Sequence, residues 1–227
     1  MDFGSGGFGA YGGGSIRLTV TGDVVNDGTI SAVGATVGTS CGSGGSVWLA
    51  VGGTLTGTGS ISANGGSRLG WEWTTGGGGR VAVFLTGVDS TFTDYAGTIT
   101  ATAGPKGQGD WFTVGGAGTV YRVSAQEGER LDVANFAGAL TNDYSWTTLG
   151  TDAKTALRNA AITVTNGATL RLEQDTYAKD LVLAEDCVLD LGTYTLRIYG
   201  KQHALPGTVI GCGNIGWIET PTVIIVR

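Results

Sequence analysis

The segment Gly45-Ser46-Val47-Trp48-Leu49-Ala50-Val51 recurs, with variations, three more times in the chain. Segments of the same pattern start at Gly14, Gly79 and Gly118, so that the four starts follow one another at similar intervals. Each segment begins with glycine and continues as an alternating run rich in β-branched residues. Such a run is typical of a strand that buries one of its faces.

A second, shorter pattern recurs in step with the first. It occurs as Thr29-Ile30-Ser31-Ala32, as Ser60-Ile61-Ser62-Ala63 and as Thr98-Ile99-Thr100-Ala101. A period of roughly 20–50 residues built from short strands is typical of a solenoid. An antiparallel sandwich also contains short strands at even spacing, but it does not require two patterns to recur in one order.

We therefore expect an all-β fold, a single-stranded parallel β-helix solenoid with glycine-rich turns and long loops on one side. Equivalent strands would stack in parallel sheets about 4.8 Å apart. A right-handed coil is the default for parallel crossovers.

The rhythm of the pattern changes along the chain. Residues 12–123 predict coils of about 31–39 residues with long loops. Residues 124–160 read as an irregular loop segment, and residues 161–227 as shorter coils with a C-terminal strand. No linker separates these parts, so we expect one domain over residues 1–227.

Glycine dominates the composition, with 43 of 227 residues, whereas proline contributes only 3. A hydrophobic share of 41% and a charged share of 14% leave enough apolar surface for folding, which excludes disorder. Glycine does not occupy every third position, so collagen is excluded as well. We place the glycines at turns and at the ends of the long loops, where they let the backbone turn sharply.

Net charge and hydropathy exclude two classes of partner. The formal net charge of −6 argues against nucleic acid, because a run of phosphates would not be neutralised. Apolar runs such as Val81–Leu85 are far too short to cross a bilayer, so we expect no membrane insertion. The first residues contain no visible signal peptide, and a piece of a longer solenoid would look the same.

The most informative loop follows the second pattern. Residues 60–78 match residues 98–116 position by position, and stacked coils would bring the matched side chains together in short ladders. The matched pairs are Arg68 with Lys106, Glu72 with Asp110, and Trp73 with Trp111, while Trp71 and Phe112 add aromatic surface.

Three interpretations of this loop face stay open. In the plainest, the tryptophans cover glycine-rich backbone and the charges form surface pairs worth under about 1 kcal/mol each. In the second, the aromatic rings are an exposed platform for sugar rings or a partner protein. In the third, Glu72 and Asp110 are a glycosidase pair. Arg68 and Lys106 oppose that chemistry by keeping both carboxylates ionised, and they oppose calcium binding too.

Other candidate chemistry is sparse. His203 lies in a turn-like segment without an evident nucleophile or acid. The three cysteines lack zinc-site spacing, and no phosphate-loop motif follows the glycine runs. Cys187 and Cys212 are separated by close to one short coil, so a disulfide and unpaired core thiols are both open. Thr-x-Thr pairs occur, but not at one phase of the pattern, which disfavours an ice-binding array. We assign no catalytic residue, metal or cofactor.

Taken together, the glycine-led strand segments and the later runs Val164-Thr165-Asn166-Gly167 and Leu189-Asp190-Leu191-Gly192 resemble a known family. They are similar to the right-handed parallel β-helix repeats of large bacterial surface and secreted proteins, of the adhesin-like and autotransporter-passenger-like kind. The resemblance covers residues 12–123 and 161–199, and it implies an extracellular or cell-surface location.

We therefore expect a non-catalytic structural or adhesive solenoid, a segment or subunit of a stalk, scaffold or filament. Its expected partners are further copies or neighbouring solenoid segments that stack end to end, because each coil buries its surface only against the next. One alternative is a carbohydrate-binding module that uses the tryptophan-rich loop face for a polysaccharide. Another is a polysaccharide lyase or glycoside hydrolase built on a β-helix.

Overall fold

The structure is a computed structural model that describes residues 9–38, 40–67, 75–105, 115–137, 139, 145–149 and 156–218. These residues form an all-β fold with mostly parallel sheets, and none of their sheets closes into a barrel. The expected all-β class is confirmed.

The recurring glycine-led segments form four strands of the largest sheet, which has eight strands in the order β1-β6-β9-β11-β12-β14-β17-β20. The first four strands pair in parallel, and Ser15, Ser46, Arg80 and Thr119 stand side by side in the register that the recurring pattern predicts. The strands are β1 (Ser15–Val20), β6 (Ser46–Val51), β9 (Arg80–Leu85), β11 (Thr119–Ser124), β12 (Gly128–Ala134), β14 (Ala160–Thr165), β17 (Asp180–Leu183) and β20 (His203–Ala204).

The shorter pattern forms a second parallel sheet of three strands. Ile30, Ile61 and Ile99 occupy equivalent positions in β3 (Thr29–Ser31), β8 (Ser60–Ser62) and β10 (Thr98–Thr100). A third pair, β2 (Val24–Val25) with β7 (Leu55–Thr56), is also parallel. Between these sheets lies the first core, made of Ala32, Val47, Leu49, Val51, Leu55, Ile61, Ala63, Val81, Val83, Leu85, Tyr95, Ala101 and Val120.

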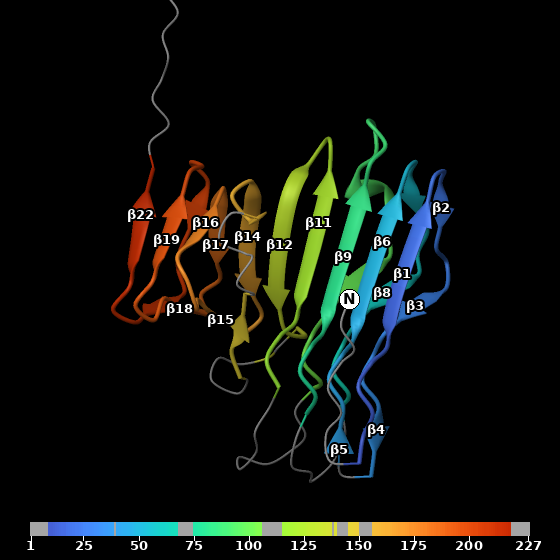
Figure 1. Cartoon of the computed structure of the whole chain (residues 1–227), viewed down its shortest axis with the longest axis horizontal. Coiled ribbons are helices and arrows are strands. Elements are labelled where there is room, and N and C mark those ends of the chain that lie inside the picture. Colours follow the sequence, from blue (N-terminus) through green and yellow to red (C-terminus); the bar gives the residue numbers. More distant parts are fainter. Residues whose placement is uncertain are drawn as a thin grey trace, which may run out of the picture.

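The main sheet changes direction between β11 and β12, where the pairing is antiparallel. The connecting turn ends at Gly128, whose φ of +77° is a left-handed conformation that glycine adopts at little cost. β14, β17 and β20 then continue parallel to β12. Figure 1 shows this reversal, with β1, β6, β9 and β11 pointing one way and β12 and β14 the other. A single uninterrupted parallel coil does not predict this hairpin.

After the hairpin the coils are shorter. Thr169 pairs with Val188, and Val188 pairs in turn with Thr208, so each of these coils takes markedly fewer residues than the coil from Ser15 to Ser46. Two further sheets stack beside the main one. One contains β13 (Thr147–Thr148), β15 (Thr169–Arg171), β18 (Val188–Asp190) and β21 (Thr208–Ile210), and the other β16 (Thr176–Ala178), β19 (Thr195–Ile198) and β22 (Asn214–Trp217).

These shorter coils enclose a second core on the opposite face of the main sheet. Val120 belongs to the first core, yet its antiparallel partner is Asp132. Leu131 belongs to the second core, and its partner is Tyr121. Because directly paired residues project to the same face of a sheet, the two cores lie on opposite faces. The second core includes Leu131, Val133, Leu149, Leu157, Ile162, Val164, Leu170, Leu172, Leu181, Leu183, Leu189, Leu191, Leu196 and Ile198.

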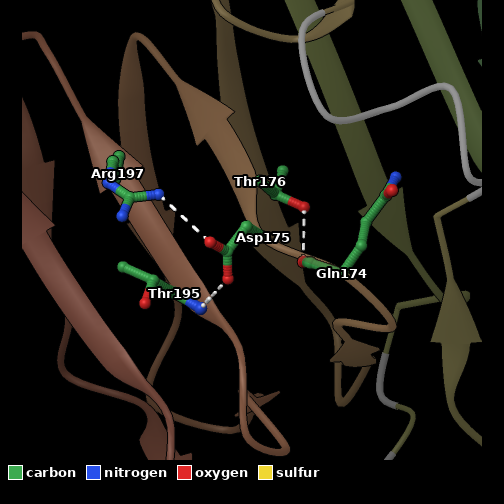
Figure 2. Close-up of polar contacts among 5 residues, drawn as sticks. All are labelled: Gln174, Asp175, Thr176, Thr195 and Arg197. Carbon is green, nitrogen blue, oxygen red and sulfur yellow. Dashed lines mark hydrogen bonds and ion pairs between the residues drawn. The ribbon is translucent and has the colours of Figure 1, made fainter.

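Carboxylates tie successive coils together at the turns. The N–H and O–H of Thr54 both donate to Oδ1 of Asp23, one coil earlier, at 2.7 and 3.0 Å. In the second set of coils, Asp175 accepts the N–H of Thr195 at 2.9 Å and contacts Nη1 of Arg197 at 3.3 Å (Figure 2). In each case an aspartate in a turn thus accepts a backbone N–H from the next coil.

Candidate functional site

The residues that the sequence singled out on the long loops lie outside the described residues. These are Arg68, Trp71, Glu72, Trp73, Lys106, Asp110, Trp111 and Phe112. The carbohydrate platform and the glycosidase pair that rest on them stay predictions. The structure does describe the stems of these loops, which are residues 63–67 with 75–79 and residues 101–105 with 115–118.

The stems are packed backbone against backbone. A Cβ on Gly42 would overlap the carbonyl oxygen of Tyr11, and one on Gly76 would overlap that of Gly42. The stem N–H groups bond across coils, as from Gly66 to the oxygen of Gly42 at 2.8 Å and from Gly104 to that of Gly76 at 2.9 Å. The stem glycines lie at the ends of the long loops, as expected, and there they allow backbone segments to pack closely against one another. They are needed where carbonyl groups approach too closely for any side chain.

A groove of about 460 Å³ lies along the return stems. Its floor is glycine backbone, and its walls carry Trp146, Arg80 and hydroxyl side chains. The lining residues are Ser43, Gly44, Gly45, Gly77, Gly78, Gly79, Arg80, Gly116, Ala117, Gly118, Thr119, Trp146, Thr147 and Thr148. The lining thus combines backbone hydrogen-bonding groups of glycines with one exposed tryptophan.

Trp146 is the aromatic residue of this groove, and its side chain is 55% exposed. The guanidinium of Arg171 lies over the indole, with Cζ 5.0 Å from the ring centroid, and supports the ring by a cation–π contact. Sequence reasoning placed Trp146 only within an irregular loop segment. It has no counterpart in the recurring patterns, so no alignment of the coils could single it out.

A charged cluster occupies the far end of the first core, at the hairpin between β11 and β12. Nε of Arg130 donates to Oδ1 of Asp132, and Nη2 of Arg122 lies 3.5 Å from Oδ2 of the same carboxylate. In register, Arg122 follows Leu49 and Val83, which are both fully buried core residues. This break in an inward-facing apolar column is a signal that sequence reasoning missed.

On the opposite face of the hairpin, Tyr121 begins the second core. Its hydroxyl donates to Oε2 of Glu129 at 2.8 Å. Burial, together with the adjacent carboxylate, raises the pKa of the Tyr121 phenol well above its usual range, so the group stays a neutral donor. The hairpin therefore presents a hydrogen-bonded tyrosine to the second core and an arginine–aspartate cluster to the first.

The three cysteines are free thiols in the structure. Cys187 is buried just before β18, whereas Cys212 is exposed after β21. The register of β18 and β21 places Val188 opposite Thr208, so the position one coil after Cys187 is Gly207. Cys212 lies further along, beside Gly192, to whose oxygen its N–H donates. The spacing of the two cysteines thus overshoots one coil, and their thiols do not stack.

Other candidate chemistry is limited to the following. His203 is exposed, and its ring packs on Trp217 with centroids 4.2 Å apart. Among the described residues, no group of three or more His, Cys, Asp or Glu side chains could hold a metal ion. The same residues contain no helix long and apolar enough to span a membrane.

Comparison of the chain with models of protein families, with curated proteins and with solved structures found no match in any of the three.

Proposed function

We propose that this chain is a structural β-solenoid, a stiff segment of an extracellular stalk, scaffold or filament whose copies stack end to end. Its parallel strands repeat at one-coil spacings on both sides of the hairpin, which supports a right-handed β-helix in two parts rather than one uninterrupted coil. Further copies can add to such a stack only at its two ends.

The observation that carries the proposal is the uncovered N-terminal end of the first core. Within the described residues, β1 pairs only with β6, which leaves the other edge of a six-residue strand open. Leu18 is 39% exposed, although its register partner Leu49 is fully buried. An open edge with an apolar face beside it is a template for a further strand.

The C-terminal end of the second core has the same character. Val209 of β21 is 40% exposed, whereas its register partner Leu189 is fully buried. Trp217 of β22, the last strand of its sheet among the described residues, is 46% exposed. Contact between the two ends would cover both sets of core residues at once.

The strand directions at the two ends favour a head-to-tail contact. β1 and β20 run in opposite directions, and their cores lie on opposite faces of the sheet. A half-turn about the long axis places β1 of the next copy parallel to β20 with its core on the matching face. Such a contact uses two different surfaces and does not close, so it generates a filament.

Two pairs of matched variants test this contact. Leu18→Lys and Val209→Lys put a charge into the open core at either end, whereas the controls Thr19→Lys and Ile210→Lys put it on the outer face of the same strands. We expect the wild type and both controls to form filaments in electron micrographs. Each core variant alone should stay monomeric in analytical ultracentrifugation.

An equimolar mixture of Leu18→Lys with Val209→Lys retains one intact end of each kind and should give a heterodimer. A wild type that stays monomeric at all concentrations contradicts the assembly proposal. A homodimer of Leu18→Lys alone would show that like ends join, which contradicts the head-to-tail geometry.

The groove beside Trp146 supports a second candidate function, the binding of a neutral carbohydrate. Sugar rings stack on exposed indoles, and backbone groups of the glycine floor are suited to hydrogen bonds with hydroxyls. A glycan array read with the wild type and Trp146→Ala tests this. The control Trp217→Ala removes a comparably exposed indole outside the groove, and retained binding by Trp146→Ala would exclude the groove.

A further inference from the structure

The hairpin end of the first core contains a cavity of about 240 Å³. It lies between the strand β10 with the residues that follow it and one face of β11, β12 and β14. The lining residues are Ile99, Thr100, Ala101, Thr102, Gly118, Val120, Arg122, Arg130, Asp132, Ala134, Asn135, Thr165 and Asn166. The cavity stands where a further coil would continue the apolar core, yet polar side chains line it.

A second hollow of about 400 Å³ adjoins this cavity and shares Arg122 and Arg130 with it. Phe92 of the short 3-10 helix η1 (Phe92–Asp94) lines its side, and Arg122 lies over the Phe92 ring with Cζ 5.8 Å from the centroid. Glu127 stands at its edge, where Oε1 accepts the N–H of Phe92. The side chains of Arg122 and Arg130 therefore line two neighbouring hollows.

Several buried polar atoms in the cavity make no hydrogen bond to the described residues. They are Nε of Arg122, Oδ2 of Asp132, and both Nδ2 and Oδ1 of Asn135. Asn135 is only 2% exposed, so water from outside does not reach its amide freely. Leaving buried donors and acceptors without partners is costly, and native proteins rarely do so without a bound group that satisfies them.

The unsatisfied atoms specify the chemistry of that group. Arg122 and Arg130 both pair with the single carboxylate of Asp132, so their remaining N–H groups are donors for an anionic ligand. Oδ1 of Asn135 needs a donor, and Nδ2 of the same amide needs an acceptor. Hydroxyl groups supply both, and the half-buried Phe92 offers an apolar surface beside the charges.

We propose that the hairpin cavity is a binding site for a sugar acid, a ligand with one carboxylate and several hydroxyls. The carboxylate binds Arg122 and Arg130, and the hydroxyls bind the amide of Asn135. A single pyranose ring matches the cavity in size, and the adjoining hollow gives a neighbouring sugar unit a place. The site is independent of the open ends of the solenoid.

Calorimetric titration of the full chain with D-glucuronate, D-glucose and acetate tests the proposal. We expect glucuronate to bind, and both glucose, which lacks the carboxylate, and acetate, which lacks the hydroxyls, to bind at least about tenfold more weakly. A hexamer of α-1,4-linked galacturonate distinguishes a polymer from a free sugar acid, because only a polymer unit gains from the second hollow. Equal affinity for glucose and glucuronate, or no binding of any acid, would overturn the proposal.

A matched pair of variants locates the site. Arg122→Gln should weaken glucuronate binding about tenfold or more, since it removes a charge-assisted hydrogen bond. Arg197→Gln removes an arginine that stands 3.3 Å from an aspartate, Asp175, outside the cavity, and should leave the affinity unchanged. Asn135→Asp is a second probe, because a new carboxylate repels the acid, and circular dichroism confirms that each variant folds. Unchanged binding by Arg122→Gln would overturn the assignment.

Discussion

A methyl group added to a stem glycine meets a main-chain carbonyl oxygen, which has no room to move. Gly42→Ala places its Cβ on the oxygen of Tyr11, whereas around Gly22 the same Cβ meets nothing within 4 Å. We therefore expect Gly42→Ala to lower the free energy of unfolding by about 3 kcal/mol or more. Gly22→Ala should be neutral or slightly stabilising. Urea denaturation of both variants measures the difference, and equal stability would contradict the close packing of the stems.

The cysteines differ in reactivity because their surroundings differ. Burial, with Asp186 beside it, raises the pKa of the Cys187 thiol to about 11, and its S–H donates to Oδ1 of Asp186 at 3.4 Å. Cys212 is exposed. We expect a thiol reagent at neutral pH to label Cys212 in the native protein, while Cys41 and Cys187 react only after unfolding. Mass spectrometry of the labelled peptides checks this, and early labelling of Cys187 would contradict the packing of the second core.

At the level of the coils, the Asp23 turn links β2 to the coil that contains β7. The N–H and O–H groups of Thr54 lower the pKa of the Asp23 carboxyl below its ordinary value of 3.8. A lowered folded-state pKa contributes stability above the unfolded value, and this contribution is lost as the pH falls through the folded value. Asp23→Asn should therefore lower the melting temperature near neutral pH and flatten its fall below about pH 4. Parallel melting curves at every pH would contradict the link.

For the molecule as a whole, the reversal at β12 predicts the symmetry of the proposed filament. Eight strands at about 4.8 Å give an axial rise of about 38 Å per copy. Because each copy is turned by half a revolution relative to the last, the filament should repeat every two copies, at about 77 Å. Helical reconstruction from electron micrographs measures both values, and a repeat of one copy would contradict the head-to-tail half-turn.

Strand positions and their register followed from the amino-acid sequence because they depend on local pattern. Glycine-led runs such as Gly45–Val51 specify where strands begin and which side chains turn inward. Stacking of the inward-facing side chains on equivalent side chains of the next strand then sets the register. Tertiary structure decided the rest. The antiparallel pairing of Arg122 with Arg130 carries the core to the other face of the sheet, although each strand alone alternates in the usual way.

The glycine content and the cavity have the same explanation. The abundance of glycine was plain in the composition, but whether a glycine serves a turn or a backbone contact depends on which distant carbonyl lies beside it, as Tyr11 lies beside Gly42. Likewise, Arg122 and Asn135 are unremarkable in the chain. They meet in one cavity because the hairpin ends the first core before its last coil is covered. Pattern along a chain determines secondary structure, whereas contacts between residues far apart in sequence determine sites.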